Sequence, residues 1–376
     1  MSALYLHIPF CLSKCPYCDF YSRIPQMGDI ERYVDALCID LNQSRASYDA
    51  GVFSSVFFGG GTPSLLSAVQ VGRILEAAQR HYGFSNDVEI TLEANPGTLQ
   101  PEQLKGYRYA GVNRLSLGVQ SFDDKQLAWL GRRHDSRQAV QAVEMARNAG
   151  FDNLSIDLMF ALPNQTLLDL EQQCHYLHQL APEHLSVYGL TIEDGTPFAV
   201  QEADGVWDMP SDEHYRDAFM LLHEQLATLG YEHYEISNYA RPGHHCRHNV
   251  GYWQRQPYLG VGAGAHSFFT QGWGERWSCQ NSIEHYLQAI TCEESPRQRL
   301  EGFTVGQAMA EFVYLALRCS SGIDEQRFET TFVQSFAEQF TRAISRCSPH
   351  LSLSNQRWRF DVEGWLLYNH LIENFM

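Results

Sequence analysis

The sequence predicts an α/β protein with a parallel sheet, followed by a smaller, mostly helical C-terminal domain. Two observations carry this prediction: strand-like and helix-like segments alternate through six units before about residue 240, and the alternation stops beyond it. Such alternation is typical of βαβ units, whose strands pair in parallel beneath outer helices. Because a complete eightfold barrel usually needs ~250 residues, six units are compatible with a partial (β/α)6 TIM-like barrel.

The individual segments follow from periodicity and from turn residues. Tyr33, Leu37 and Leu41 recur at helical spacing, whereas residues 87–93 alternate between polar and apolar as a strand does. The predicted strands are 3–8, 52–58, 87–93, 114–119, 153–158 and 184–191, and the predicted helices are 30–44, 65–82, 101–110, 137–149 and 167–180. Since parallel strands collect functional loops at their carboxyl ends, we expect the site there.

The chain changes in texture after about residue 240. Residues 241–277 are rich in Gly, His and aromatic residues with little periodicity, which predicts a long structured loop or small subdomain. Further on, the pattern predicts helices over 307–319, 325–344 and 364–374 and a strand over 357–362. The predicted domains are a partial barrel (1–240), a His- and aromatic-rich connecting region (241–300) and a mostly helical C-terminal domain (301–376), of which a winged helix is one form.

Composition restricts the compartment and the partners. No uninterrupted apolar run approaches the ~20 residues of a membrane span, and the N-terminus lacks the order of a signal peptide, so we expect a cytoplasmic protein. Ten scattered cysteines among 376 residues indicate reduced thiols rather than a disulfide framework. The 27 basic and 44 acidic residues give a formal charge of -17, which disfavours general nucleic-acid binding.

Three cysteines within eight residues follow the first predicted strand. Cys11, Cys15 and Cys18 have the spacing CxxxCxxC, which can ligate three irons of a 4Fe-4S cluster and leave the fourth iron open. A zinc loop is the alternative, but zinc would need a fourth ligand, and the nearest candidate, His7, lies in a predicted strand.

This spacing, with the aromatic Tyr17 just before the last cysteine, resembles the cluster loop of the radical SAM superfamily. The resemblance implies that S-adenosylmethionine chelates the open iron. An electron from the cluster would then split a carbon–sulfur bond, giving methionine and a 5′-deoxyadenosyl radical. It also implies the partial barrel fold and an electron donor for the cluster.

The resemblance further implies a binding site for S-adenosylmethionine. Glycines 59–61, with Thr62 and Pro63, are a tight turn when considered alone; beside the cysteines they resemble the loop that receives the cofactor's amino group. The residues that the resemblance implies for cofactor binding are Tyr5, Tyr17, Gly60, Gly61, Thr62, Glu93, Gln120, Arg132 and Asp157. For the strand-end residues Glu93 and Asp157, helix capping is the alternative.

Three further stretches resemble one branch of the superfamily. Residues 5–11, 115–122 and 234–240 are similar to the HemN/HemW branch, which contains oxygen-independent coproporphyrinogen III oxidases and heme chaperones. The oxidases carry a fourth cysteine two residues past the third, where this chain has Phe20, and a long N-terminal arm, whereas ten residues precede Cys11 here. Both departures favour the chaperone side.

A histidine-rich stretch provides candidate heme ligands. His248 to Trp253 is similar to the HNxxYW signature of the chaperones, so His248 is the predicted heme ligand, and His266 is a further candidate. Nearby cations that could meet heme propionates are Arg241, Arg247 and Arg255. Packing beneath the C-terminal domain is the alternative role for this stretch.

The predicted function is therefore a radical SAM-type heme chaperone that binds a 4Fe-4S cluster, S-adenosylmethionine and heme and transfers heme to an apocytochrome. The alternative is an oxygen-independent coproporphyrinogen III dehydrogenase, in which the radical abstracts hydrogen from propionate side chains. The sequence disfavours that activity but leaves open whether the chain is an enzyme. Membrane contact through a partner and a homodimer are both compatible with the sequence.

Overall fold

A single twelve-stranded sheet forms the centre of the computed structural model, which describes residues 2–45, 48 and 51–376. The strand order is β12-β11-β10-β9-β1-β2-β3-β4-β5-β6-β8-β7. Strands β1 to β6 lie in chain order, and each pairs in parallel with the next. The six predicted parallel strands are confirmed.

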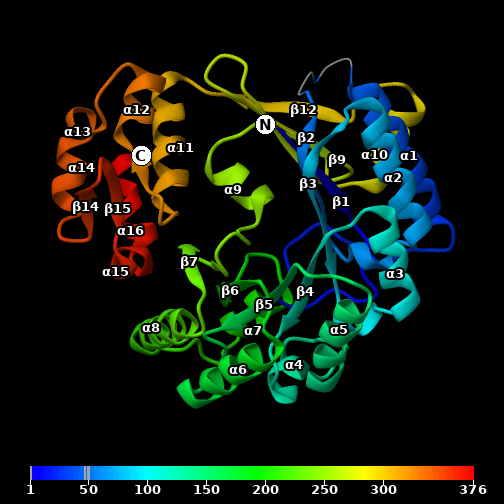
Figure 1. The fold of residues 1–376 in the computed structure, drawn as a ribbon, viewed down its shortest axis with the longest axis horizontal. Helices are drawn as coiled ribbons and strands as arrows, with labels where there is room; N and C mark the ends of the chain where they lie inside the picture. Colours follow the sequence, from blue (N-terminus) through cyan, green and yellow to red (C-terminus); the bar gives the residue numbers. More distant parts are fainter. Residues whose placement is uncertain (1, 46–47, 49–50) are drawn as a thin grey trace.

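Helices connect these six strands and cover their outer face (Figure 1). In chain order the elements are β1 (Ser2–Ile8), α1 (Asp29–Ser44), β2 (Phe53–Gly60), α2 (Ala68–His81), β3 (Phe84–Ala94), α3 (Pro101–Ala110), β4 (Arg114–Gln120), α4 (Asp124–Trp129), α5 (Ser136–Asn148), β5 (Leu154–Phe160), α6 (Leu167–Leu180) and β6 (His184–Gly189). Reciprocal hydrogen bonds of a capping box, as between Ser67 and Gln70, fix the start of α2, and α5 and α6 begin in the same way.

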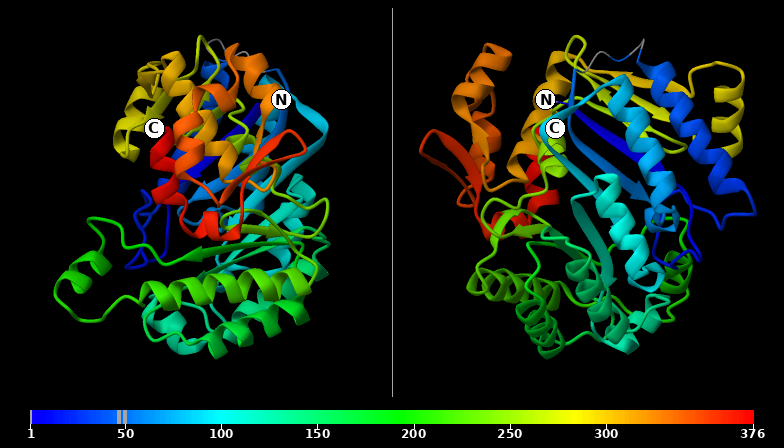
Figure 2. Two further views of the ribbon diagram at one scale, coloured as in Figure 1. Left: turned by 90° about the vertical axis from the view of Figure 1, so that its left-hand side faces the viewer. Right: turned by 45° about the vertical axis from the view of Figure 1, so that its right-hand side comes forward.

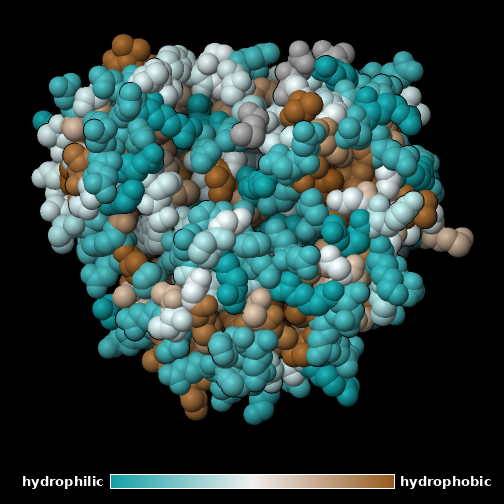
Figure 3. Space-filling view, viewed as in Figure 1, coloured by the Kyte–Doolittle hydropathy of each residue, from teal (hydrophilic) through white to brown (hydrophobic). Residues whose placement is uncertain are grey.

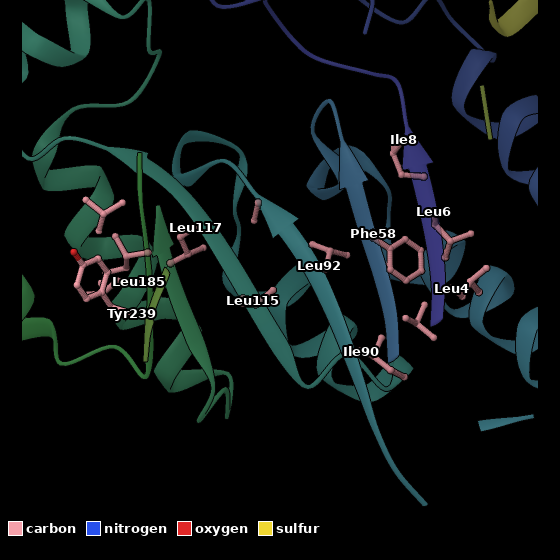
Figure 4. Packing of buried hydrophobic residues seen from close by; sticks show 14 of the residues in the cluster. Leu4, Leu6, Ile8, Phe58, Ile90, Leu92, Leu115, Leu117, Leu185 and Tyr239 are labelled. Carbon is pink, nitrogen blue, oxygen red and sulfur yellow. The ribbon is translucent and has the colours of Figure 1, made fainter. Parts of the chain in front are cut away.

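Side chains alternate along each parallel strand between an apolar outer face and a mostly polar inner face. Leu4, Leu6 and Ile8 of β1 are fully buried in the core shared with the helices, as are Leu115 and Leu117 of β4 (Figure 4). The residues between them, such as Tyr5 and Ser116, face the interior cavities. Filled barrels carry bulky aliphatic residues at such positions. This barrel instead has a polar interior with room for ligands.

Residues 241–277, for which the sequence predicted a long structured loop or small subdomain, contain more regular structure than their weak periodicity indicated. Residues 241–302 form α9 (Arg247–Trp253), β9 (Tyr258–Val261), β10 (His266–Phe269), β11 (Glu275–Cys279), α10 (Ile283–Thr291) and β12 (Arg297–Gly302). Strand β9 pairs in parallel with β1, and β10 to β12 continue the sheet in antiparallel fashion. Strands of four to six residues are too short to show periodicity, and their partners lie far away in the chain.

Elements on the opposite edge were also missing from the prediction. After β6, the chain forms α7 (Pro197–Ala203), α8 (Asp212–Thr228), β7 (Glu232–Glu235) and β8 (Asn238–Ala240). Strand β8 pairs antiparallel to β6, and β7 closes that edge of the sheet.

The C-terminal part is mostly helical, as predicted, and forms a lobe beside the sheet (Figure 2). Its elements are α11 (Val305–Leu317), β13 (Ile323–Asp324), α12 (Glu325–Phe332), α13 (Phe336–Gln339), α14 (Thr341–Arg346), β14 (Leu351–Ser354), β15 (Arg357–Phe360), α15 (Val362–Leu366) and α16 (Tyr368–Ile372). The single helix predicted over 325–344 is broken, because Val333 adopts a left-handed conformation that ends α12. The strands β13, β15 and β14 form a small antiparallel sheet.

The surface seen in Figure 3 is mostly hydrophilic, with apolar residues scattered over it. Among the described residues, no helix is both long enough and apolar enough to cross a membrane.

A buried ion pair joins α1 to the added strands and provides a test of their packing. Arg297 of β12 pairs with the fully buried Asp40 at 2.7 Å and donates to the Gly260 carbonyl at 2.8 Å. Arg297→Met should lower the free energy of unfolding by about 3 kcal/mol, since it leaves the Asp40 charge buried without its partner.

Chemical denaturation measures this loss. Lys105→Met is the control, because the exposed Lys105–Glu102 pair should contribute less than about 1 kcal/mol. Equal losses in the two variants would contradict a structural role for the Arg297 pair.

Candidate functional site

The loop that carries the three cysteines leaves the carboxyl end of β1 and is closed at its neck. The Cys11 amide donates to the Arg23 carbonyl at 3.0 Å, and the Arg23 amide donates to the Pro9 carbonyl at 2.9 Å. Phe10 is fully buried and packs edge-on against Tyr33, with ring centroids 5.4 Å apart. The neck therefore fixes where the cysteine loop starts and ends.

The distal part of the loop rests on α7 and its surroundings. Pro16 accepts a hydrogen bond from the Phe198 amide at 3.1 Å, and Tyr17 packs against the Phe198 ring. Phe198 belongs to a small apolar cluster with Leu130 and Leu162. The distal part of the cysteine loop therefore packs on a small apolar cluster that is separate from the main hydrophobic core.

The three thiols are free, half-buried and face one cavity of about 470 Å³. Cys11 Sγ accepts from the Thr62 hydroxyl at 3.4 Å, and Cys15 Sγ accepts from Arg132 Nη1 at 3.4 Å. In the described part of the chain, no group of three or more His, Cys, Asp or Glu side chains converges closely enough to hold a single metal ion.

Eleven of the twelve residues predicted for the cluster and its cofactor line this one cavity. They are Cys11, Cys15, Tyr17, Cys18, Gly60, Gly61, Thr62, Glu93, Gln120, Arg132 and Asp157. They come from the cysteine loop, the carboxyl ends of β2 to β4, the middle of β5 and the segment after α4. The carboxyl ends of the parallel strands thus bring together residues that are up to 146 positions apart in the chain (11 to 157).

Packing also explains why the loop has glycine at positions 60 and 61, in addition to the predicted role in cofactor binding. A Cβ atom on Gly61 would come within 2.7 Å of the Phe10 carbonyl oxygen, and one on Gly60 would lie 2.6 Å from the His7 ring. Gly60 also has a φ of 108°, which side chains rarely tolerate. The Thr62 amide donates to the Phe10 carbonyl at 2.7 Å. The glycines therefore let the end of β2 cross directly over the neck of the cysteine loop.

Two carboxyl groups lie together in the polar interior. Burial, reinforced by the charge of Asp157, raises the pKa of Glu93 to about 8. Burial likewise raises the pKa of Asp157 to about 6, although Ser116 donates to Asp157 at 3.0 Å and opposes that shift. A cation bound between them would favour the ionised forms, so the pair is suited to a positively charged ligand.

Two residues on the β4 side are in unfavourable states: Arg132 has an unsatisfied polar atom, and Gln120 has a strained backbone. Arg132 Nη2 donates to the Gly118 carbonyl at 2.6 Å, but its Nε is buried with no partner among the described residues. Gln120 ends β4 with a φ of 70°, a left-handed conformation that is unusual for a residue other than glycine. Such strained residues cluster at binding sites, where the surroundings hold them in place.

Tyr5 is the one predicted residue that lies deeper in the barrel. It lines an inner cavity of about 210 Å³, which shares Glu93 and Asp157 with the larger one. Other lining residues that the sequence did not indicate are Arg114, Ser116, Ser186 and Tyr188. Steps of two positions back from Gln120 could have found Ser116 and Arg114 on β4, because alternate residues share a face.

His248 closes the floor of this inner cavity. It is 1% exposed, its Nδ1 shares a hydrogen bond with Ser55 at 2.9 Å, and its Nε2 shares one with Tyr252 at 2.8 Å. Burial lowers the pKa of His248 to about 3, so the ring is neutral. With both nitrogens engaged, His248 has no free atom for an iron in this arrangement. Its role as heme ligand stays a prediction that the geometry does not support.

The other candidate heme contacts are not brought together. Arg247 pairs with Asp87, Arg255 pairs with Glu311, and Arg241 lies over the Tyr231 ring. His266 is exposed on β10. The structure therefore gathers the cluster and cofactor residues but does not gather the predicted heme residues around His248.

Comparisons with known proteins agree with this geometry. Residues 5–177 match the family model described as "Radical SAM superfamily", and residues 304–367 match "HemN C-terminal domain". The heme chaperone HemW of Haemophilus influenzae is 37% identical over 385 residues, covering all of this chain and 97% of the relative. The heme chaperone HemW of Lactococcus lactis is 34% identical over 377 residues, again covering all of this chain and 97% of the relative.

A solved structure, titled as coproporphyrinogen III oxidase (HemN) from Escherichia coli, a radical SAM enzyme, shares the fold. Its TM-score is 0.86 at 24% identity, and the match covers all of this chain and 89% of that chain. The predicted radical SAM fold is confirmed.

The radical SAM match implies a 4Fe-4S cluster and S-adenosylmethionine, and the residues present fit both. Three thiols in one cavity provide soft ligands for three irons. The buried Nε of Arg132, which has no partner in the described part of the chain, suits a carboxylate, and the Glu93–Asp157 pair suits a sulfonium or ammonium cation.

The strain at Gln120 leads to a prediction that separates folding from binding. Gln120→Gly should keep the free energy of unfolding within about 1 kcal/mol of wild type, because relief of the left-handed strain offsets the added flexibility of the unfolded chain. The affinity for S-adenosylmethionine should fall by about tenfold through loss of the amide. Denaturation and calorimetric titration measure the two effects.

Val333→Gly is the matched control, since Val333 has a φ of 58° but lies on the surface of the C-terminal lobe. It should leave cofactor binding unchanged. Undiminished affinity in Gln120→Gly would show that the amide does not contact the cofactor.

The raised pKa of Glu93 leads to a prediction about pH. Between the unfolded value of 4.5 and the folded value of about 8, the native carboxyl keeps a proton that the unfolded chain releases, so stability falls as pH rises. From about pH 5.5 to about pH 8, wild type should lose up to about 3 kcal/mol more than Glu93→Gln, both without cofactor. Urea denaturation at the two pH values measures this, and parallel losses would contradict the assignment.

Proposed function

Because the chain belongs to the radical SAM superfamily and, within it, to the HemN/HemW branch, we propose that it is a heme chaperone. In this proposal it holds a 4Fe-4S cluster and S-adenosylmethionine, carries heme as cargo and transfers the heme to a cytochrome. It works in the cytoplasm and contacts the membrane through its partner. An electron donor reduces the cluster, and a homodimer stays a prediction.

The residues of the larger cavity receive individual roles in this proposal. Cys11, Cys15 and Cys18 would hold the cluster through three of its irons, and the cavity that they line would hold S-adenosylmethionine beside it. When bound, this pair supplies one-electron cleavage of a carbon–sulfur bond. Arg132 pairs with the cofactor carboxylate, which would satisfy its buried Nε.

The remaining lining residues orient the cofactor and exclude water. Gly60 and Gly61 give its amino group access to the backbone, where a side chain would collide. Glu93 and Asp157 face the positive charge and the ribose, and Gln120 offers its amide. Tyr5 lies deeper, in the inner cavity that Glu93 and Asp157 also line, and would lie near the sulfonium.

The observation that favours a chaperone over an oxidase is the extent of the resemblance to relatives named HemW, combined with Phe20. These relatives are 34–40% identical, and the first two cover the whole chain. Phe20 stands where the oxidases resembled carry a fourth cysteine, and its side chain is 62% exposed at the rim of the cavity. A fourth thiol is therefore absent from this position.

An anaerobic assay separates the two functions. The protein with reconstituted cluster is incubated with S-adenosylmethionine, a reductant and either coproporphyrinogen III or hemin followed by an apocytochrome. We expect a heme-bound spectrum and transfer to the apocytochrome without vinyl products. Vinyl formation would favour the dehydrogenase, and absence of hemin binding would remove the chaperone function.

Two cysteine variants, prepared in the same way, test the assignment of the cluster ligands. Cys15→Ala should lose the absorption of the cluster, whereas Cys292→Ala should keep it, because Cys292 is exposed and lies outside the cavity.

A further inference from the structure

A separate cavity of about 360 Å³ lies between α9 and the C-terminal helices. Helix α9 stands between the sheet and α11 (Figure 1). Its residues His248, Asn249 and Tyr252 face the inner cavity of the barrel, whereas Val250 and Trp253 face this second one. Helix α9 therefore separates two cavities, and Trp253 lines the second cavity but not the inner cavity of the barrel.

The walls of this α9/α11 cavity are mostly apolar and carry cations at the rim. Trp253, Phe312 and Ala316 line it, together with Arg327 and Arg357. The Arg327 guanidinium lies 5.2 Å from the centre of the Phe312 ring. Trp253 Nε1 is buried and has no partner in the described part of the chain. An apolar ligand that carries carboxylates suits this combination of side chains.

The charges around the rim are not all positive. Asp324 also lines the cavity and pairs with Arg357 at 2.7 Å, which leaves Arg357 partly neutralised. Arg327 instead donates to the Gln254 carbonyl at 2.9 Å and has no carboxylate partner among the described residues. Arg327 is thus the guanidinium more available to an incoming carboxylate.

His245 also lines this cavity, and breaking its present ion pair would cost little free energy. Its Nε2 pairs with Glu232 at 3.0 Å, but the two side chains are 40% and 53% exposed, so the pair contributes little stability. The ring is held in a parallel stack on Tyr234, with centroids 4.2 Å apart. His248 differs, because both of its hydrogen bonds involve buried or half-buried partners inside the molecule.

Cys319 also lines the cavity but is a poorer ligand. Burial raises the pKa of its thiol to about 12, which keeps it protonated at neutral pH. Iron binds the thiolate form, whereas a histidine binds as the neutral imidazole. His245 is therefore the better placed of the two donors.

We propose that the α9/α11 cavity is the cargo site for ferric protoporphyrin IX, with His245 as axial ligand and Arg327 and Arg357 facing the propionates. The inference rests on the proposed function, since it locates the heme of the chaperone. It separates the cargo from the cluster cavity and places it at the surface, where an acceptor can reach it.

Hemin titration of the full chain, followed by difference absorption spectra against cluster-loaded protein, tests this site. His245→Ala should weaken hemin affinity by about tenfold or more and shift the Soret band, while binding of metal-free protoporphyrin IX stays unchanged. Ala316→Phe should weaken both ligands, because it fills the cavity. Arg327→Gln should also weaken both, through loss of a propionate contact.

Matched controls accompany each variant. His244→Ala changes the neighbouring histidine, which does not line the cavity, and Arg346→Gln changes an exposed arginine elsewhere in the same lobe. Both should bind hemin as wild type does. Circular dichroism and the absorption of the cluster establish that each variant is folded.

The possible results separate the site from the function. If wild type binds no hemin, the proposed function itself fails. If wild type binds hemin but Ala316→Phe and His245→Ala bind it equally well, only the location is overturned. Loss of binding in a folded His248→Ala with retention in His245→Ala would assign the ligand to His248 and overturn the inference; if His248→Ala does not fold, the Ala316→Phe result decides.

Discussion

The alternation of side chains along β1 to β6 is the constraint on which the rest of the structure depends. Apolar residues at every second position anchor each strand to the outer helices, so the intervening positions must face the barrel interior. A slip of one residue would exchange the two sets, and the apolar core would resist that slip. The register that satisfies the core is therefore the register that brings Glu93, Ser116 and Asp157 together.

A polar interior is electrostatically unfavourable without a ligand. The charge of Asp157 disfavours ionisation of Glu93, and burial disfavours ionisation of both carboxyl groups. Arg132 keeps a buried nitrogen that has no partner among the described residues, and Gln120 stays in a strained conformation. A ligand with a cation and a carboxylate would relieve the costs at the two carboxyl groups and at Arg132. The scaffold supplies the stability that the site lacks, which is the usual division between a rigid core and a functional loop region.

The sequence predicted the parts of the site that local chemistry determines. The cysteine spacing, the glycine run and the polar strand ends are each visible within a few residues, and they meet because parallel strands end at one edge. Strands β9 to β12 and helix α9 are short and pack against partners far away in the chain. Their sequences therefore show no hydrophobic periodicity that would have predicted them. His248 illustrates the limit: its motif indicated importance, but its burial depends on Ser55, which lies 193 residues earlier.

Helix α9 has only seven residues, and its two faces belong to different environments. On one face, His248 ties it to β2 through Ser55, next to the residues that surround the cofactor cavity. On the other, Trp253 packs beneath Arg318, which pairs with the fully buried Glu235. Because a helix of two turns moves as a unit, displacement of His248 would also displace Trp253. The tyrosine and tryptophan of the YW pair, adjacent in sequence, thus serve opposite cavities, which explains why a single motif contains residues that need not share a ligand.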